Sequence, residues 1–211
     1  MTPYQTEQLQ TLQTVRRYLA QIPVAARETL KAGLADYLNF RNAVDAFQEN
    51  YFHDTCNRKC FQSELSACCS RDAIIIFFAD VLINALMADA AALERLQDAL
   101  THPHEGFKCV FLGTKGCLWS VKPIICEFFL CAAAENAALK ENPVARKRWE
   151  ALVEQKKAFT WPDRPVLFDT LEQIFIDAGY TSPLMFLHNS PGLLRIKRQG
   201  RQNKSKQKRE A

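Results

Sequence analysis

Eight cysteines are the residues of this chain best suited to chemistry, and they fall into two groups of four. The first group has the spacing C-x3-C-x7-C-C, and the second has the spacing C-x7-C-x8-C-x4-C. The members are Cys56, Cys60, Cys68 and Cys69 in the first group, and Cys109, Cys117, Cys126 and Cys131 in the second. Four thiolates are a typical ligand set for zinc or an iron–sulfur cluster, whereas magnesium and calcium prefer oxygen. The pattern therefore predicts that all eight cysteines bind metal.

The spacing leaves the identity of the metal open between zinc and an iron–sulfur cluster such as a four-iron cubane. Short gaps of roughly two to four residues between cysteine ligands are common at zinc sites. Cys56 and Cys60 have such a gap, and so do Cys126 and Cys131. The adjacent Cys68 and Cys69 point different ways, so they serve two metals or bridge one polynuclear centre. Because the double cysteine and the long gaps suit a larger centre, we favour iron–sulfur. Each group alone is an irregular segment, so we expect both to converge on one centre or on two adjacent centres.

Several other polar residues lie close to the cysteines in the sequence. Cations that would lower the thiol pKa values flank both groups: Arg58, Lys59, Arg71, Lys108, Lys115 and Lys122. The histidines are expected mainly in exposed loops, with metal ligation as the alternative: His53, His102, His104 and His188. Asp80 and Asn84 interrupt an apolar run, and we expect them on a solvent-facing helix edge in preference to a position behind the metal ligands. Trp119 is expected in the core in preference to shielding a metal.

The charge of the chain is concentrated at its end. The whole sequence carries +4, but residues 195–211 contain 8 lysines and arginines and one acid, which gives this tail +7 and leaves −3 for the rest. A tail with so little apolar character cannot bury itself, so we expect disorder and a solubilising role. Nucleic acid is an alternative partner for it. The predicted division is a helical domain over 1–194, with its metal-binding core at about 56–131, and the tail.

The predicted location is cytoplasmic, where thiols stay reduced and cysteines more often bind metals than form disulfides. The N-terminus lacks the features of a secretory signal. The most apolar run, 73–88, is shorter than the roughly 20 residues that span a membrane, so it is expected in the core. Metal ions are the predicted partners, a protein partner is also open, and no membrane association is expected.

Hydrophobic periodicity predicts an all-α fold. Apolar stripes predict helices over about 4–21, 25–49, 80–100 and 167–175, the last closed by Gly179. A helix through 132–140 and another capped by Asn142, with Pro143 at its first position, complete the set. The segment from Ile74 to Phe78 suits a short strand or the start of a buried helix. These elements would form one helical domain in which two loops carry the cysteines.

The stretch from Phe107 to Cys131 resembles the YkgJ-like cysteine-cluster family, whose pattern has C-x-F/Y-L, then G-C-x-I-Y, then R-P-x-x-C-R. The matching positions are Cys109, Phe111, Leu112, Gly116, Cys117, Pro123 and Cys126. The earlier part of the pattern is matched by Cys56, Cys60, Cys68, Cys69 and Ile74. This chain departs from the pattern where Lys122 and Glu127 replace arginines, and where C-x3-C replaces C-x2-C. The resemblance covers about a third of the chain.

The resemblance implies a zinc- or iron-chelating domain that uses the eight cysteines. A related cysteine arrangement occurs in flagellin lysine N-methylases, so a cluster-dependent protein lysine N-methyltransferase is the alternative function. No dinucleotide-binding, P-loop or nucleophile-elbow motif is visible, and no catalytic residue can be named. We therefore expect a metal-binding protein in preference to an enzyme.

Overall fold

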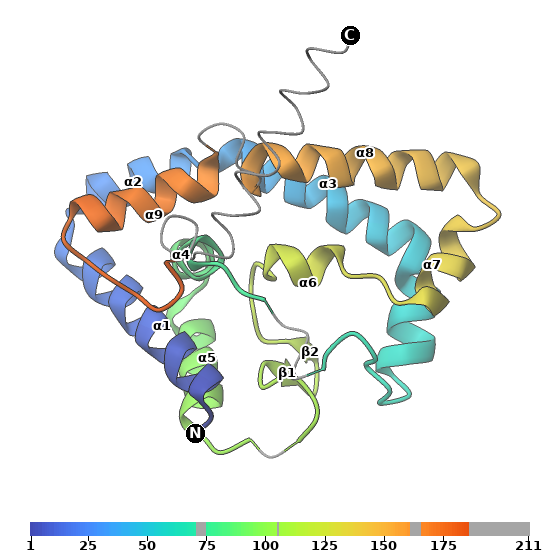
Figure 1. Ribbon diagram of the computed structural model, residues 1–211, viewed down its shortest axis with the longest axis horizontal. Coiled ribbons are helices and arrows are strands. Elements are labelled where there is room, and N and C mark those ends of the chain that lie inside the picture. Colours follow the sequence, from blue (N-terminus) through green and yellow to red (C-terminus); the bar gives the residue numbers. More distant parts are fainter. Residues whose placement is uncertain (71–74, 105, 161–165, 186–211) are drawn as a thin grey trace, which may run out of the picture.

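The computed structural model describes residues 1–70, 75–104, 106–160 and 166–185. Helices dominate this part of the chain, and the predicted all-α class is confirmed (Figure 1). The elements in chain order are α1 (Pro3–Gln21), α2 (Val24–Ala32), α3 (Ala35–Phe52), the π-helical η1 (His53–Phe61), α4 (Phe78–Met87), α5 (Ala90–Thr101), β1 (Leu112–Gly113), β2 (Gly116–Cys117), α6 (Ile124–Phe128), α7 (Ala132–Leu139), α8 (Pro143–Thr160) and α9 (Leu167–Asp177).

Several predicted helix ends are confirmed by their capping groups. Asn142 caps α8 because its Oδ1 accepts a hydrogen bond from the backbone N–H of Ala145 at 2.9 Å. Gly179 closes α9 with a φ of +78°, a left-handed conformation that glycine adopts without steric cost. Two predicted helices are each divided in two. The first breaks at Gly33 between α2 and α3, and the second breaks where Asp89 caps α5 by accepting from the N–H of Ala92 at 2.6 Å.

Two local predictions were wrong. Cys56 and Cys60 lie on the helical element η1, not in a loop, and Cys126 lies within α6. The second cysteine-bearing segment, expected as a loop, contains the β1–β2 hairpin. Of the two alternatives for the segment from Ile74 to Phe78, the structure has the helix start, since α4 begins at Phe78 and residues 75–77 are not in a strand. Ile74 itself lies outside the described residues.

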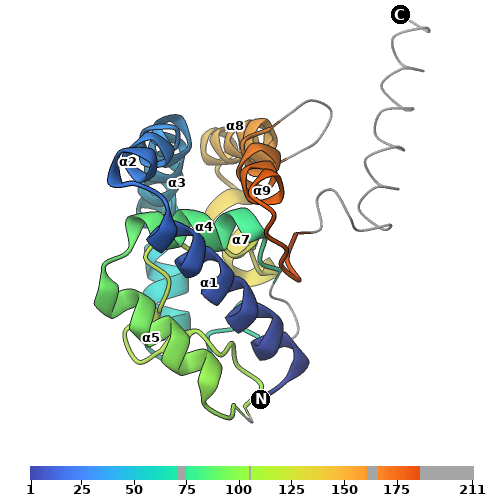
Figure 2. The same ribbon diagram turned by 90° about the vertical axis from the view of Figure 1, so that its left-hand side faces the viewer.

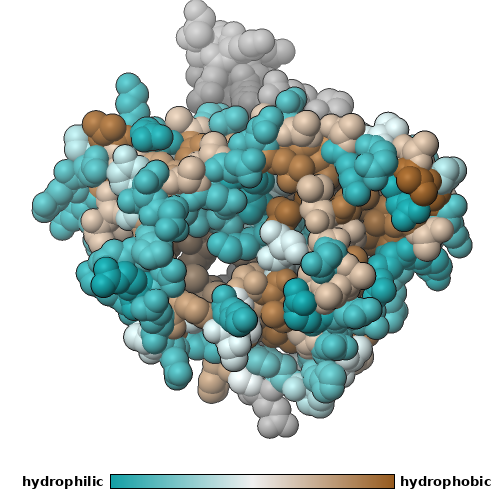
Figure 3. All heavy atoms as spheres, turned by 180° about the vertical axis from the view of Figure 1, so that it is seen from behind, coloured by the Kyte–Doolittle hydropathy of each residue, from teal (hydrophilic) through white to brown (hydrophobic). Residues whose placement is uncertain are grey.

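The helices are arranged around α4, whose side chains are mostly buried. α1 packs across α4 and α5, while α9 contacts α4 from the other side (Figure 2). α8 packs against α3 and α9 in the layer at the top of Figure 1, and α7 connects that layer to η1. Seen from behind, the surface is hollowed near its middle (Figure 3). This frame leaves η1, the hairpin, α6 and α7 together at one side of the molecule.

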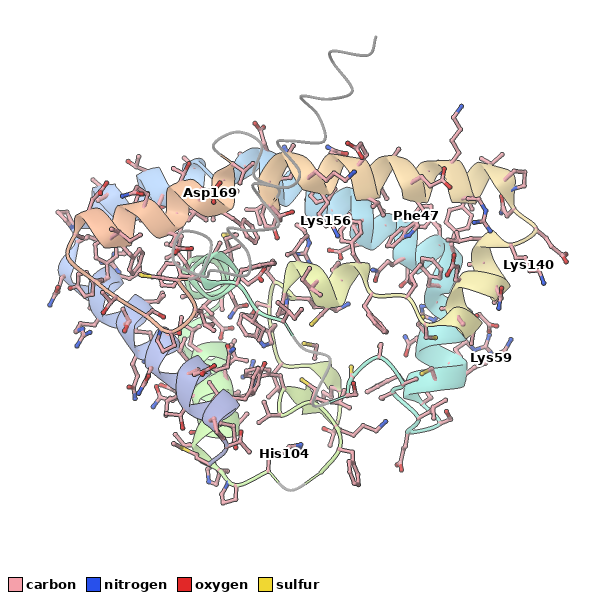
Figure 4. The ribbon with its side chains drawn as sticks, viewed as in Figure 1. Phe47, Lys59, His104, Lys140, Lys156 and Asp169 are labelled. Carbon is pink, nitrogen blue, oxygen red and sulfur yellow. The ribbon has the colours of Figure 1, made fainter. Side chains whose placement is uncertain are left out.

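An aromatic cluster fixes that side to the rest of the core. Phe128 of α6 stacks on Phe40 at 5.9 Å and on Trp149 at 5.1 Å between ring centroids, and Trp149 also stacks on Phe47 at 5.4 Å. Buried aromatic pairs of this kind contribute about 0.5–1.5 kcal/mol each beyond their burial. Lys156 of α8 adds a cation–π contact to the cluster, with its Nζ 4.8 Å from the centroid of the Phe128 ring (Figure 4). α3, α6 and α8 are therefore held as one unit.

Some predictions fall outside the described residues, namely the tail over 195–211 together with Arg71 and His188. Within the described ranges, none of the helices is both long enough and apolar enough to cross a membrane.

Candidate metal centre

The two cysteine groups meet through their backbones. The N–H of Cys109 donates to the carbonyl oxygen of Cys69 at 2.9 Å, and Ser70 forms an antiparallel bridge with Lys108. The Nζ of Lys108 also donates to the carbonyl oxygens of Leu65 and Ser66. The segments that carry the two groups therefore meet at Cys69 and Cys109.

The hairpin positions two cysteines of the second group. Cys109 precedes β1 and Cys117 ends β2, where it pairs with Leu112 in the antiparallel register. The tight turn places Gly116 at a φ of +112°, which favours glycine. The backbone N–H of Phe111 donates to the Sγ of Cys109 at 3.3 Å, and the N–H of Trp119 hydrogen-bonds the sulfur of Cys117. Such donors stabilise a thiolate, whether it is free or bound to a metal.

The first group is positioned by η1 and the turn that follows it. Cys60 Sγ accepts a hydrogen bond from the N–H of Ala67 at 3.3 Å, which brings the turn back over the helix. Glu64 and Ser66 adopt positive φ values of 62° and 38° in this turn. Cys131 of the second group lies at the N-cap of α7, and α7 packs against η1.

The thiols lie close enough to influence one another's ionisation. Burial raises the pKa of both Cys109 and Cys126 to about 12, and the neighbouring thiol of Cys117 adds to both shifts. A hydrogen bond between the side chains of Cys68 and Cys69 raises the pKa of Cys68 and lowers that of Cys69. These crowded thiols favour the protonated state on their own, and a bound cation would reverse that preference.

Exposure differs among the cysteines. Cys109 is buried, whereas Cys56, Cys68 and Cys117 have solvent-exposed surface. Protein atoms nevertheless surround Cys117 closely enough for burial to be the main cause of its raised pKa. Sulfur atoms gather in the region bounded by η1, α6 and the hairpin (Figure 4). Within the described part of the chain, no set of three or more Cys, His, Asp or Glu side chains is arranged to hold an ion, so metal binding would require the sulfurs to move closer together.

Asp80 and Asn84 are buried supports of this region, and the prediction that they face solvent was wrong. Asp80 is 3% exposed and Asn84 is 1% exposed. Asp80 Oδ1 accepts from the N–H of Ile124, and Asn84 Oδ1 accepts from the N–H of Val121, both at 3.0 Å. Asp80 Oδ2 also accepts from the N–H of Phe77 at 3.0 Å. The two α4 side chains therefore fix the segment that leads into α6 and Cys126.

Replacing Asp80 with alanine should lower the free energy of unfolding by about 2–4 kcal/mol at pH 5, because two buried N–H groups lose their acceptor. Burial raises the pKa of Asp80 from 3.8 to about 7, so ionisation between these values costs the folded state stability. The difference between variant and wild type should therefore shrink as the pH rises from 5 to 7, and it should be smaller above pH 7 than at pH 5. Urea unfolding at both pH values measures it, with exposed Glu94→Ala as the control. Equal stability of the Asp80 variant and wild type at pH 5 would contradict this role.

A buried charge network beside Cys126 was missed by the sequence analysis. Glu127 is 2% exposed, and its Oε2 lies 3.1 Å from Arg41 Nη2 and 3.5 Å from Lys122 Nζ. Arg41 Nη1 also donates to the Lys122 carbonyl at 2.8 Å and to the Tyr37 hydroxyl at 3.0 Å. The pattern offered one signal, since Arg41 follows Tyr37 by one helical turn on the apolar face of α3. The network ties α3 to the segment before Cys126.

The flanking cations Arg58, Lys59 and Lys122 have different roles. Arg58 and Lys59 both pair with Asp54, at 3.5 Å and 2.7 Å, and these contacts are exposed. Lys122 acts on the thiols, since its charge lowers the pKa values of Cys56, Cys68 and Cys117.

The described histidines make local contacts. His53 Nδ1 lies 2.9 Å from Glu49, His102 Nδ1 lies 2.7 Å from the carbonyl of Asp98, and His104 Nε2 lies 2.8 Å from the carbonyl of Lys108.

Trp119 belongs to the core, as predicted. It is 7% exposed and makes a T-shaped contact with Phe111 at 5.3 Å between ring centroids. The two rings thus bury the residues on either side of the hairpin that carries Cys117.

In comparisons with known proteins, no family model matches the chain, and no curated protein or solved structure is significantly similar to it.

Proposed function

We propose that this protein binds metal through its eight cysteines, which hold an iron–sulfur cluster or zinc. The observation that carries the proposal is the hydrogen bond between the backbones of Cys69 and Cys109, which joins two cysteine groups far apart in the sequence. Residues that merely fill a core as small hydrophobes need no such convergence. The similarity of residues 107–131 to the YkgJ-like pattern supports the same chemistry.

The surroundings of the sulfurs fit a thiolate-bound metal. Backbone N–H groups donate to the sulfurs of Cys60, Cys109 and Cys117, and hydrogen bonds of this kind stabilise metal-bound thiolates. Lys122 adds a positive charge beside the thiols. A metal ion or cluster held here would take the thiols in their deprotonated form, so binding would release protons and weaken at low pH.

We favour iron–sulfur over zinc because the vicinal Cys68 and Cys69, together with the long gaps, suit a polynuclear centre. Anaerobic purification of the full chain, followed by metal analysis, acid-labile sulfide analysis and a visible spectrum, tests this choice. We expect brown protein that contains iron and sulfide in matching amounts.

Colourless protein with stoichiometric zinc, without sulfide and without a cluster after reconstitution, would select zinc instead. Protein that takes up neither metal under either condition would refute the metal-binding proposal. Aerobic preparations are unsuitable for this test, since zinc can occupy a vacated thiolate site.

One polar cavity of the described structure does not support the methyltransferase alternative. A polar cavity of about 540 Å³ lies between α1 and the turn at 181–183, and it is lined by Gln10, Gln13, Thr14, Arg17, Thr181, Ser182 and Pro183. None of these residues is a cysteine or a neighbour of one, so this cavity does not place a substrate beside the sulfurs.

A further inference from the structure

We propose that the eight cysteines form two adjacent four-thiolate sites, each of which draws cysteines from both sequence groups. This inference rests on the proposed metal-binding function. Site A comprises Cys69, Cys109, Cys117 and Cys126, and site B comprises Cys56, Cys60, Cys68 and Cys131. The division runs between the adjacent Cys68 and Cys69, so the two sites differ from the two groups that the sequence presents.

The backbone geometry assembles site A. Cys69 and Cys109 are held side by side by the 2.9 Å hydrogen bond between their main chains, and the bridge between Ser70 and Lys108 extends this pairing. The hairpin returns the chain from Cys109 to Cys117, since the N–H of Leu118 donates to the carbonyl of Phe111 at 2.9 Å.

Cys126 is the fourth member of site A. It lies in α6, whose first residue, Ile124, is anchored to Asp80 of α4. The segment before it, which leads from the hairpin to α6, is anchored by Asn84, which accepts from the N–H of Val121. α4 thereby fixes the position of the segment that carries Cys126.

Helix packing assembles site B. η1 carries Cys56 and Cys60 one turn apart, and α7 packs against η1 with Cys131 at its N-cap. The N–H of Ala67, the residue before Cys68, donates to the Sγ of Cys60 at 3.3 Å. Cys68 is therefore held beside η1, while its neighbour Cys69 is tied to Cys109.

The two sites adjoin at Cys68 and Cys69, which follow each other in the sequence but belong to different sites. Adjacent centres would influence each other's affinity.

Loading the full-length apoprotein with Co²⁺ tests the division, because the absorption spectrum of cobalt reports how many thiolates surround each ion. Wild type should bind two ions per chain with four-thiolate spectra. The variant Cys69→Ser/Cys109→Ser removes two ligands of site A alone, so we expect one ion that retains the wild-type spectrum. The matched variant Cys60→Ser/Cys69→Ser removes one ligand from each site, so no bound ion should retain the four-thiolate spectrum.

In the reverse pattern, Cys60→Ser/Cys69→Ser keeps a four-thiolate ion and Cys69→Ser/Cys109→Ser loses it. That result would overturn the crossed division and favour sites made of the two sequence groups. Loss of all cobalt from both variants while wild type binds it would indicate one shared centre and also overturn the proposal. A wild-type chain that binds neither cobalt, zinc nor iron would refute the proposed function itself.

A measurement on wild-type apoprotein avoids any folding defect of the variants. A short bifunctional thiol reagent, applied under native conditions and followed by peptide mapping, should join Cys69 to Cys109 and Cys56 to Cys131. Cross-links confined to each sequence group, such as Cys117 to Cys131, would contradict the division.

Discussion

Replacing Cys109 with serine should cost the protein the metal of site A and lower its melting temperature more than any change at the surface. Cys109 is buried, and its sulfur accepts the N–H of Phe111, so it occupies a fixed position between the hairpin and Cys69. Serine is a poor ligand for soft metals, and its hydroxyl does not ionise at neutral pH. A site reduced to three thiolates would hold its metal weakly.

The expected loss of stability is large because the free energy of metal binding is also folding free energy. Structural zinc in small domains contributes about 10–16 kcal/mol, while a whole domain is stable by only about 5–15 kcal/mol. We expect the metal-loaded variant to lose several kcal/mol relative to the metal-loaded wild type, as measured by thermal unfolding together with metal content.

The matched control is the same comparison without metal. In the presence of a chelator, wild type and Cys109→Ser should unfold within about 1–2 kcal/mol of each other, since only a buried thiol has been exchanged for a hydroxyl. If the two loaded proteins hold equal metal and unfold at the same temperature, Cys109 is not a ligand.

The fold class and the long helices could be predicted from the sequence because amphipathic periodicity and capping residues are local signals. Asn142 with Pro143 marked the start of α8, and Gly179 marked the end of α9. The division of the helix expected over 25–49 was not predicted, because its apolar stripe continues across Gly33, where α2 ends and α3 begins.

The cysteines as candidate ligands could also be predicted, because their residue type and clustering are visible in the sequence. The proposed division of the cysteines between two sites could not be predicted from the sequence. It depends on contacts such as that between Cys69 and Cys109, which are 40 positions apart. The roles of Asp80 and Asn84 were hidden for the same reason. A polar residue in an apolar run is predicted to be exposed unless the backbone N–H groups that donate hydrogen bonds to it are known.

Substitution of Arg41 by methionine should destabilise the protein by about 3–5 kcal/mol, because it leaves Glu127 buried without its main partner. The Arg41 side chain is buried and bonds to Glu127, to the carbonyl of Lys122 and to the Tyr37 hydroxyl. Lys122 reaches Glu127 only at 3.5 Å and from a half-exposed position, so it compensates in part. Chemical denaturation at pH 7 gives the loss, with Arg95→Met on the exposed face of α5 as the matched control.

The double variant Arg41→Met/Glu127→Gln separates the cost of a stranded charge from the loss of packing. If the charge dominates, the double variant should recover a large part of the loss, because a neutral amide is far cheaper to bury than an unpaired carboxylate. Burial already raises the pKa of Glu127, and removing Arg41 should raise it further, so the single variant should regain stability as the pH falls and Glu127 takes up a proton. A double variant no more stable than Arg41→Met, with no recovery at low pH, would show that Arg41 acts through packing and not through its charge.

Because the same side chain fixes the Lys122 carbonyl ahead of Cys126, the single variant should also bind metal less tightly, whereas Arg95→Met should leave metal binding unchanged.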